Sequence, residues 1–448
     1  MRFDSFRELL SYWAEKRPDA PALRYGSETR SFAGLWEDVQ SRAETLQSEP
    51  SACVGILADG SLRCVEEIFA ANLAGKQIVL LDALAPAGLL KTLIRYTDVD
   101  ALWGDADLAE ELEMALNRPC VQDGADKLLF FTSGTTEQAK AVVLTDHSLC
   151  QSAYNGSCML PLQTEDTLLC LLPLGHVFGF VCGLLWGLSC GACVALGRGA
   201  RHYLDDCAFY RPTAVSVVPM LLGFLLRQNC MNAELKLILV GAGDCSPALL
   251  QAAAAKGLRV SFGYGLTETS SGVAISVGDD PYAMEICPDD TVTLAEDGEI
   301  LIEAPTCMMQ GYYKQSAATW EVLRGGVLRT GDLGRFDEAG RLHITGRKKD
   351  ILVLPDGTKL FLPEYEARLM TALGHTELAV TLRDNKPLLV FVGTAEEKTL
   401  WEKLQGLMLQ LPRGQQLAGI LITDEALPRT ATGKIKRWEL QQKVGDPT

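Results

Sequence analysis

The chain has 448 residues, of which 48% are hydrophobic and 22% are charged. This composition is typical of a globular protein and excludes a disordered or fibrous one, and the length predicts two or three domains. The formal charge of the chain is −16. The part before Gly346 carries 44 acidic and 26 basic residues, whereas the rest is nearly neutral. We therefore expect no nucleic-acid binding by the acidic part, and the shift in composition suggests a boundary near residue 346.

The N-terminal residues are charged where a signal peptide would need an apolar run, which predicts a cytoplasmic protein. Residues Leu168–Gly197 carry no formal charge and are numerous enough to span a bilayer. They include Pro173 and several glycines, so we expect a buried helix with flanking strands and no membrane span. The 14 cysteines are scattered, which predicts reduced thiols; Cys190 and Cys193 form an isolated C-x-x-C without further ligands for a metal.

Short β-rich runs alternate with amphipathic helical segments along most of the chain. The pattern predicts helices over Leu62–Ala74 and Ser246–Lys256 and layered α/β sheets that are mostly parallel. The predicted strands are Val54–Leu57, Gln77–Leu81, Lys127–Thr132, Thr167–Leu172, Ala214–Val218, Leu235–Val240 and Leu258–Phe262.

The pattern changes after Asp290, where the strands become shorter. Turn sequences at Asp297-Gly298, Gly325-Gly326 and Ala339-Gly340 predict a small antiparallel or barrel-like β unit. The last hundred residues again mix short strands and helices, which predicts a separate small α+β unit.

One segment, Leu128–Leu144, suggests a phosphate-binding loop. An apolar strand leads into small hydroxyl residues and a glycine, whose N–H and O–H groups can converge on an anion, and a lysine follows. The order differs from that of a P-loop. On composition alone, a Ser/Thr-rich turn would explain it equally well. The residues in question are Thr132, Ser133, Gly134, Thr135, Thr136 and Lys140.

Further segments follow along the chain, and several of them contain a group suited to a nucleotide. An aromatic ring can stack on a base, a carboxylate can bind Mg²⁺ or two hydroxyl groups, and a lysine in a glycine turn can screen two anions. Taken singly, each segment could be an ordinary turn or basic tail. The segments are Gly241-Ala242-Gly243, Gly263–Thr269 (GYGLTET), Arg329–Leu333 (RTGDL), Gly346–Asp350 (GRKKD), Pro363–Glu366 (PEYE) and Pro428–Lys436 (PRTATGKIK).

Together these segments resemble, in kind and order, the motifs of the adenylate-forming superfamily, which includes acyl- and aryl-CoA synthetases, peptide-synthetase adenylation domains and luciferases. The resemblance extends over roughly residues 5 to 440. The phosphate loop departs from the family pattern at Glu137, Ala139 and Ala141, where Gly, Pro and Gly are usual. Because of this departure, the family pattern does not determine how this loop binds pyrophosphate.

The resemblance implies a role for each motif residue. The loop residues named above would bind the ATP phosphates, Thr267 would contact the α-phosphate and Glu268 would hold Mg²⁺. Lys434 would bridge the substrate carboxylate and the α-phosphate, and Lys349 would be a hinge. The residues implied for adenine and ribose are Gly241, Ala242, Gly243, Tyr264, Asp332 and Arg347.

The resemblance also implies the architecture and the reaction. Residues 1–346 would form the AMP-binding domain, with layered α/β sheets and the small β unit, and residues 347–448 a mobile α+β domain. ATP and Mg²⁺ would convert a carboxylic acid into an acyl-adenylate and pyrophosphate, and CoA would then accept the acyl group.

The acid is suggested by Leu172–Gly179 (LPLGHVFG), which resembles a stretch of acyl- and aryl-CoA ligases in which His176 lies near the carboxylate or the thiol channel. The stretch lacks the aspartate that binds an amino acid, so a fatty or aryl acid is expected. Residues 349–357 resemble a stretch of longer-chain acyl-CoA synthetases, which mildly favours a fatty acid, whereas the length of the chain is similar to that of compact aryl-type ligases. Two alternatives are an acyl-carrier-protein ligase and a nucleotide-binding homologue with weakened catalysis.

Overall fold

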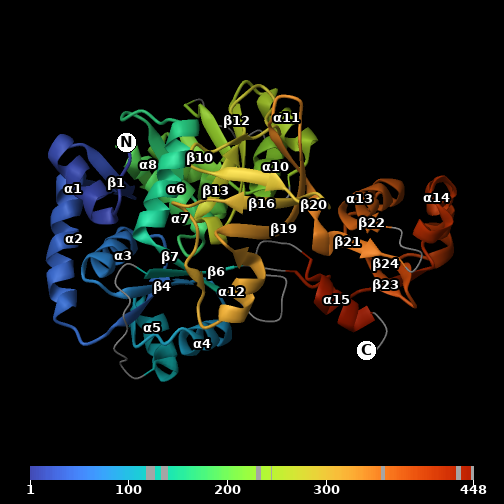
Figure 1. The fold of residues 1–448 in the computed structure, drawn as a ribbon, viewed down its shortest axis with the longest axis horizontal. Helices are drawn as coiled ribbons and strands as arrows, with labels where there is room; N and C mark the ends of the chain where they lie inside the picture. The colour runs from blue at the N-terminus through green and yellow to red at the C-terminus, as the bar shows by residue number, and fades with distance from the viewer. Residues whose placement is uncertain are drawn as a thin grey trace.

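The chain folds into a large unit followed by a small one, which lie side by side in Figure 1. The small unit contains the C-terminal residues, drawn in orange and red. The structure is a computed structural model, and it describes residues 1–117, 127–132, 140–228, 234–243, 245–354, 359–429 and 435–444.

Within these ranges, one sheet of the large unit has six strands in the order β17-β7-β6-β4-β3-β5. The strands β5, β3, β4 and β6 are parallel to one another, whereas β7 pairs antiparallel with both β6 and β17. The strands and the helices associated with them are β3 (Cys53–Ala58), α3 (Leu62–Leu73), β4 (Gln77–Asp82), α4 (Ala87–Tyr96), β5 (Ala101–Trp103), α5 (Ala106–Leu112), β6 (Lys127–Phe131), β7 (Ala141–Thr145) and β17 (Gly311–Tyr312).

A second, nine-stranded sheet of the described chain has the order β14-β13-β12-β11-β10-β8-β9-β1-β2, and its central strands from β12 to β1 are parallel. Its strands are β1 (Pro21–Tyr25), β2 (Glu28–Ser31), β8 (Thr167–Cys170), β9 (Cys193–Leu196), β10 (Ala214–Val217), β11 (Leu237–Val240), β12 (Arg259–Leu266), β13 (Ser271–Ile275) and β14 (Glu285–Ile286). The accompanying helices are α1 (Phe6–Lys16), α2 (Phe32–Gln47), α6 (Asp146–Met159), α9 (Tyr203–Tyr210), α10 (Pro219–Gln228) and α11 (Pro247–Ala254).

The predicted layered α/β architecture is confirmed. Burial on both faces explains the continuous apolar runs of the central strands. In β11, Ile238 and Val240 enter the largest hydrophobic cluster, whereas the alternate residues Leu237 and Leu239 enter another one on the opposite face.

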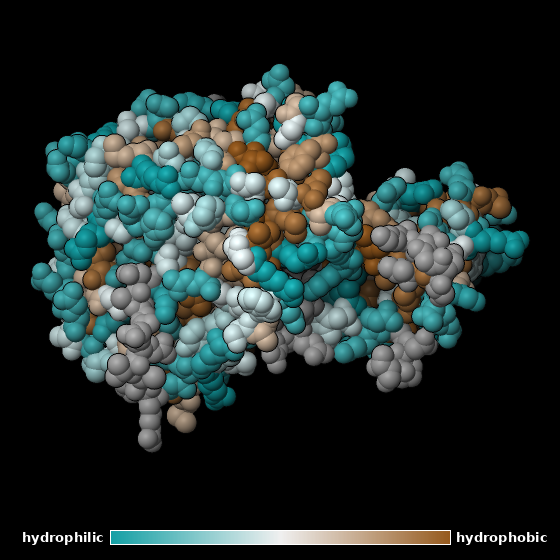
Figure 2. Space-filling view, in the orientation of Figure 1, coloured by the Kyte–Doolittle hydropathy of each residue, from teal (hydrophilic) through white to brown (hydrophobic). Residues whose placement is uncertain are grey.

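Figure 2 shows apolar surface over α10, where Met220 and Phe224 are exposed.

The uncharged stretch Leu168–Gly197 forms a buried helix between two strands, as predicted. Between β8 and β9 lie α7 (Val177–Phe180), the π-helical turn Val181–Leu185 and α8 (Trp186–Ser189). No helix in the described part of the chain is both long and apolar enough to cross a membrane. The cysteines of the described segments are free thiols.

The antiparallel unit predicted after Asp290 is also present. The strands β16, β19 and β20 pair antiparallel, and the three predicted turn sequences connect successive strands. The elements are β15 (Thr291–Leu294), β16 (Glu299–Glu303), α12 (Ser316–Val322), β18 (Leu323–Arg324), β19 (Val327–Phe336) and β20 (Leu342–Arg347).

The small unit has a hydrophobic core of its own, in which Leu369, Leu389 and Leu404 are fully buried. Its three-stranded sheet has the order β23-β24-β25. The elements are β21 (Ile351–Val353), β22 (Lys359–Phe361), α13 (Leu362–Leu373), β23 (Leu378–Arg383), β24 (Lys386–Val392), α14 (Glu397–Gln410), β25 (Gly419–Thr423) and α15 (Arg437–Val444).

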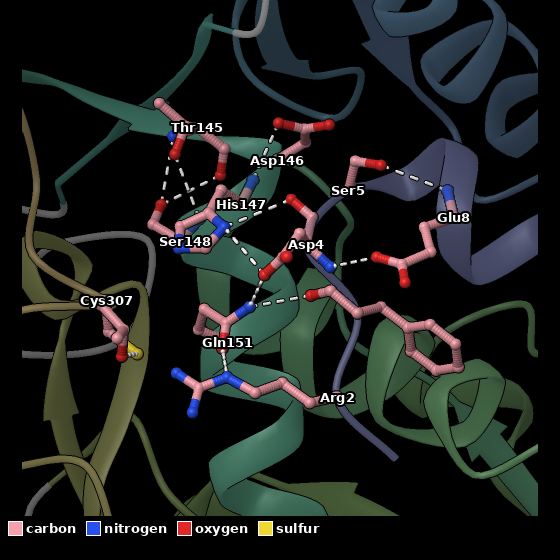
Figure 3. Close-up of polar contacts among 12 residues, drawn as sticks. Arg2, Asp4, Ser5, Glu8, Thr145, Asp146, His147, Ser148, Gln151 and Cys307 are labelled. Carbon is pink, nitrogen blue, oxygen red and sulfur yellow. Dashed lines mark hydrogen bonds and ion pairs between the residues drawn. The ribbon is translucent and has the colours of Figure 1, made fainter.

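The start of α6 is fixed by polar contacts that Figure 3 shows in detail. The hydroxyl groups of Thr145 and Ser148 each accept a hydrogen bond from the other residue's backbone N–H, at 3.0 and 3.1 Å, which forms a capping box. Gln151 donates to the backbone oxygen of Phe3 at 2.8 Å, so the N-terminal segment is held against the same helix. These contacts anchor the last residue of β7, the strand that begins directly after Lys140.

Candidate active site

Four residues with informative chemistry or backbone geometry lie at or after the carboxyl ends of strands in the two sheets. Asp82 ends β4 and Thr132 follows β6 in the six-stranded sheet; His176 follows β8 and Gly241 follows β11 in the nine-stranded one. In α/β proteins the carboxyl ends of parallel strands form the usual ligand-binding edge of a sheet. The position of these residues therefore supports a single composite site.

The strands on either side of the phosphate-loop segment, β6 and β7, pair with each other. The backbone N–H of Thr132 donates to the carbonyl oxygen of Lys140 at 3.0 Å, and Phe131 pairs with Ala141. Ala141, one of the departures from the family pattern, is thus a buried strand residue. The predicted phosphate-binding residues at the tip, namely Ser133, Gly134, Thr135 and Thr136, lie outside the described residues, as do Glu137 and Ala139.

The predicted magnesium ligand, Glu268, lies in the short 3-10 helix Thr267–Thr269, directly after β12. Its side-chain Oε1 accepts a hydrogen bond from the phenol of Tyr312 at 2.7 Å, and its carbonyl oxygen accepts one from Met309 at 2.8 Å. Gly265 is required here, because a Cβ would lie 1.7 Å from the backbone oxygen of Ser271. The turn that carries Thr267 and Glu268 is therefore tightly fixed.

Glu268 suits a magnesium ion chemically, since Mg²⁺ in nucleotide sites is commonly held by one or two carboxylates together with phosphate oxygens and water. No group of three or more His, Cys, Asp or Glu side chains that could hold a metal occurs within the described ranges. A metal at Glu268 would therefore depend on phosphate oxygens for further ligands, as a metal carried by ATP does.

The predicted nucleoside residues Tyr264, Asp332 and Arg347 form one cluster. The phenol of Tyr264 donates to Asp332 Oδ2 at 2.9 Å, and Arg347 Nε lies 2.7 Å from Asp332 Oδ1. Asp332 is 2% exposed and faces Arg347 across the antiparallel pair β19–β20. Burial and the adjacent carboxylate raise the pKa of Tyr264 well above its usual range, so the phenol stays a hydrogen-bond donor.

The turn Gly241-Ala242-Gly243 follows β11 and has unusual backbone geometry. Ala242 has a φ of 58°, in the left-handed region that a side chain disfavours. A Cβ at Gly241 would approach the ring of Phe178 to 2.8 Å, so α7 packs directly on this turn. The structure therefore brings the predicted adenine turn beside the segment that contains His176.

His176 lies at the meeting point of the two sheets. It directly precedes α7, and its Nε2 lies 4.0 Å from Oδ2 of Asp82, at the end of β4 in the other sheet. Burial lowers the pKa of His176, and the Asp82 carboxylate partly opposes this shift. Our sequence analysis missed Asp82, although the residue directly follows the strand predicted over Gln77–Leu81.

Of the motif residues beyond the large unit, the predicted hinge Lys349 is exposed, in the short 3-10 helix Lys348–Asp350. The neighbouring Lys348 contacts Asp297 at 2.5 Å and Glu299 at 2.8 Å in the antiparallel β unit. Lys434 lies outside the described residues.

Sequence analysis also missed the structural role of Arg437, the residue after the PRTATGKIK segment. Its guanidinium contacts the two carboxylate oxygens of Glu366 at 2.6 and 2.8 Å. Glu366 also accepts a hydrogen bond from the backbone N–H of Val380 at 2.6 Å. The contact joins two motifs, PEYE and PRTATGKIK, that the sequence treats as separate.

Comparison with known proteins agrees with this arrangement. The family model of AMP-binding enzymes matches residues 10–313, which is more than half of the chain. The chain therefore belongs to the AMP-binding enzyme family, and the predicted membership of the adenylate-forming superfamily is confirmed.

Among curated proteins, the chain is similar to the 2-succinylbenzoate–CoA ligase of Bacillus licheniformis, with 27% identity over 96% of this chain and 98% of the relative. It is also 27% identical to the corresponding ligase of Bacillus subtilis, over 83% of this chain and 84% of the relative.

Solved structures support the fold. O-succinylbenzoate CoA synthetase from Bacillus subtilis, in complex with the acyl-adenylate intermediate, superposes with a TM-score of 0.83 at 23% identity, covering 98% of both chains. The anthranilate CoA ligase AuaEII, in complex with anthranoyl-AMP, has a TM-score of 0.83 at 20% identity, covering 99% of this chain and 98% of that one.

Proposed function

We propose that the protein is an AMP-forming acid–CoA ligase that activates an aryl carboxylic acid. The observation that carries the proposal is that Tyr312 joins Lys140 to Glu268 in a chain of the AMP-binding family, which also contains the Tyr264–Asp332–Arg347 cluster. Tyr312 contacts both Lys140 and Glu268, so the groups suited to phosphate and to metal belong to one site.

In the first step, a carboxylate oxygen of the acid attacks the α-phosphorus of ATP, and the bond to the β-phosphate oxygen breaks to release pyrophosphate. Both reactants are anionic, so the task of the protein is positioning and charge neutralisation. Lys140 and Thr132 would bind the β- and γ-phosphates with the loop between them, Thr267 would contact the α-phosphate, and Lys434 would neutralise the acid. Mg²⁺, held at Glu268, would offset phosphate charge.

In the second step, the sulfur of CoA attacks the acyl carbon, and the bond between that carbon and the AMP oxygen breaks. A neutral His176 beside Asp82 can orient the acyl group or accept the thiol proton, because burial favours the uncharged imidazole.

Residues 347–448 would act as a domain that turns about Lys349 and withdraws Lys434 between the two steps. The separate hydrophobic cores before and after this boundary support that division.

The relatives favour an aryl acid. The ligases above are named for 2-succinylbenzoate and anthranilate, both aromatic acids. A mycobacterial fatty acyl-CoA synthetase has a lower TM-score, 0.72, at 21% identity. The ring of Phe178, packed on Gly241, provides an apolar surface beside His176 that suits an aromatic ring. Of the proteins named here, the curated relatives act on an aromatic acid by name, one structural neighbour is named for a fatty acid, and none is named for an acyl carrier protein.

The test is ATP–pyrophosphate exchange across a panel of acids: 2-succinylbenzoate, anthranilate, benzoate, hexanoate and palmitate. We expect exchange with at least one aromatic acid and a thioester product when CoA is added. Holo acyl carrier protein, supplied in parallel, should accept no acyl group. Exchange with the fatty acids alone would contradict the aryl assignment, and silence with every acid in an ATP-binding sample would favour a weakened homologue.

A further inference from the structure

Tyr312 occupies a position between two elements that the proposed reaction requires. It lies on β17, the edge strand that pairs with β7, and Tyr312 faces Val142, two residues after Lys140. Its backbone N–H donates to the hydroxyl of Thr319 at 2.8 Å. The side chain is 7% exposed, so the strand and the helix α12 fix its direction.

The phenol of Tyr312 reaches the carboxylate of Glu268. Its O–H donates to Oε1 of Glu268 at 2.7 Å, across a separation of 44 residues in the sequence. A hydrogen bond to a charged acceptor is stronger than a neutral one and fixes the orientation of the carboxylate.

The ring of Tyr312 contacts the lysine of the phosphate loop. Lys140 Nζ lies 4.4 Å from the ring centroid, within the range of a cation–π interaction. The same residue thus contacts a predicted phosphate cation with its ring and a predicted metal ligand with its hydroxyl.

The segment before Tyr312 supports the same turn from its other side. The backbone N–H of Met309 donates to the carbonyl oxygen of Glu268 at 2.8 Å, and the Ser270 hydroxyl donates to the carbonyl oxygen of Cys307 at 2.8 Å. Residues 307–312 therefore hold both the backbone and the side chain of the Glu268 turn in register with β7.

We propose that Tyr312 is a positioning residue of the nucleotide site, which orients the Glu268 carboxylate for Mg²⁺ and sets its separation from Lys140. The proposal rests on the proposed function for the identity of the nucleotide. Residues that orient metal ligands by hydrogen bonding commonly change metal affinity or activity by about ten- to a hundredfold when they are replaced.

The experiment measures binding of α,β-methylene ATP to the full chain by calorimetry while the Mg²⁺ concentration is varied. This analogue cannot be adenylated, so the readout does not require turnover or an acid substrate. In Tyr312→Phe, which loses only the hydroxyl, the Mg²⁺ concentration for half-maximal binding should rise about tenfold. Binding of the analogue in EDTA should be unchanged, because the ring still contacts Lys140.

Tyr313→Phe is the matched control. Tyr313 is the next residue, and its phenol donates to Asp98 at 3.0 Å, away from Glu268. Its loss should leave the Mg²⁺ dependence unchanged. A wild-type-like Mg²⁺ dependence in Tyr312→Phe, or an equal change in Tyr313→Phe, would overturn the proposal. Nucleotide binding by the wild type that does not depend on Mg²⁺ would also overturn it.

A double substitution separates positioning from a general loss of stability. If Tyr312 acts through Glu268, Tyr312→Phe should add less than a twofold effect in a Glu268→Gln background. Full additivity would overturn the proposal. If the wild type shows no exchange with any acid of the panel but still binds the analogue in a Mg²⁺-dependent way, the proposed reaction is rejected. The binding data then decide the role of Tyr312 independently of that reaction.

Discussion

The large and small units differ in how their motif residues are placed. In the large unit, Glu268 and Asp332 are held by buried contacts with distant strands. In the small unit, Arg437 directly follows the motif that contains Lys434 and forms a partly buried ion pair with Glu366, while Lys349 is exposed in the connecting turn. The difference fits the proposed division of labour, in which the large unit binds the nucleotide and the small unit, with a hydrophobic core of its own, carries Lys434.

The strongest test of this contrast is removal of the presented charge. Lys434→Ala should lower the rate of acyl-adenylate formation by about a hundred- to a thousandfold, since one electrostatic group that neutralises the reacting anions is lost. Thioester formation from a supplied acyl-adenylate should keep its rate. The two half-reactions are measured separately by pyrophosphate release and by CoA thioester production; equal losses in both would contradict the division of labour.

The ion pair of Arg437 and Glu366 tests whether the small unit is stabilised independently. Arg437→Met leaves the buried Glu366 carboxylate without its cation, which should lower the free energy of unfolding of that unit by about 3 kcal/mol. Hydrogen exchange followed by mass spectrometry should show faster exchange in α13 and β23 and unchanged protection in the nine-stranded sheet.

Lys443→Met provides the control for that experiment. It removes a cation from the same helix, but Lys443 has an exposed side chain 3.8 Å from Glu439 and should contribute less than about 1 kcal/mol. Equal loss of protection in both units after Arg437→Met would argue against independent cores.

A smaller effect is expected from Asp290 in the large unit. Burial, with a contribution from Asp289, raises the pKa of Asp290 to about 7, and Asn155 donates to its Oδ2 at 3.2 Å. A raised pKa means that the folded state binds the proton more tightly than the unfolded state does. The stabilisation is therefore complete below about pH 4 and is lost as the pH rises through 7.

Asp290→Asn should remove this pH dependence, because the amide resembles the protonated carboxyl group. Urea unfolding should give a variant about 2 kcal/mol more stable than the wild type at pH 8 and of similar stability at pH 4. Asp279→Asn, an exposed carboxylate nearby, is the control and should change neither value. An advantage of Asp290→Asn that is the same at both pH values would reject the titration as its cause.

Sequence alone predicted the positions of several strands along the chain, the small antiparallel unit after Asp290, and the motifs that identify the family. These features depend on local patterns: apolar runs, turn residues such as Asp297-Gly298, and short segments with distinctive chemistry. Even the uncharged stretch Leu168–Gly197 could be interpreted as a buried helix, because its proline and glycines do not fit a membrane span.

Only the tertiary structure decided which side chains complete the site. Asp82 meets His176 because two sheets end at the same place, and Tyr312 meets Glu268 because β17 pairs with β7. Neither contact has a local signature, since an aspartate after a strand or a tyrosine in an edge strand is common. Such contacts depend on how distant strands pair and pack, which the pattern of neighbouring residues does not specify.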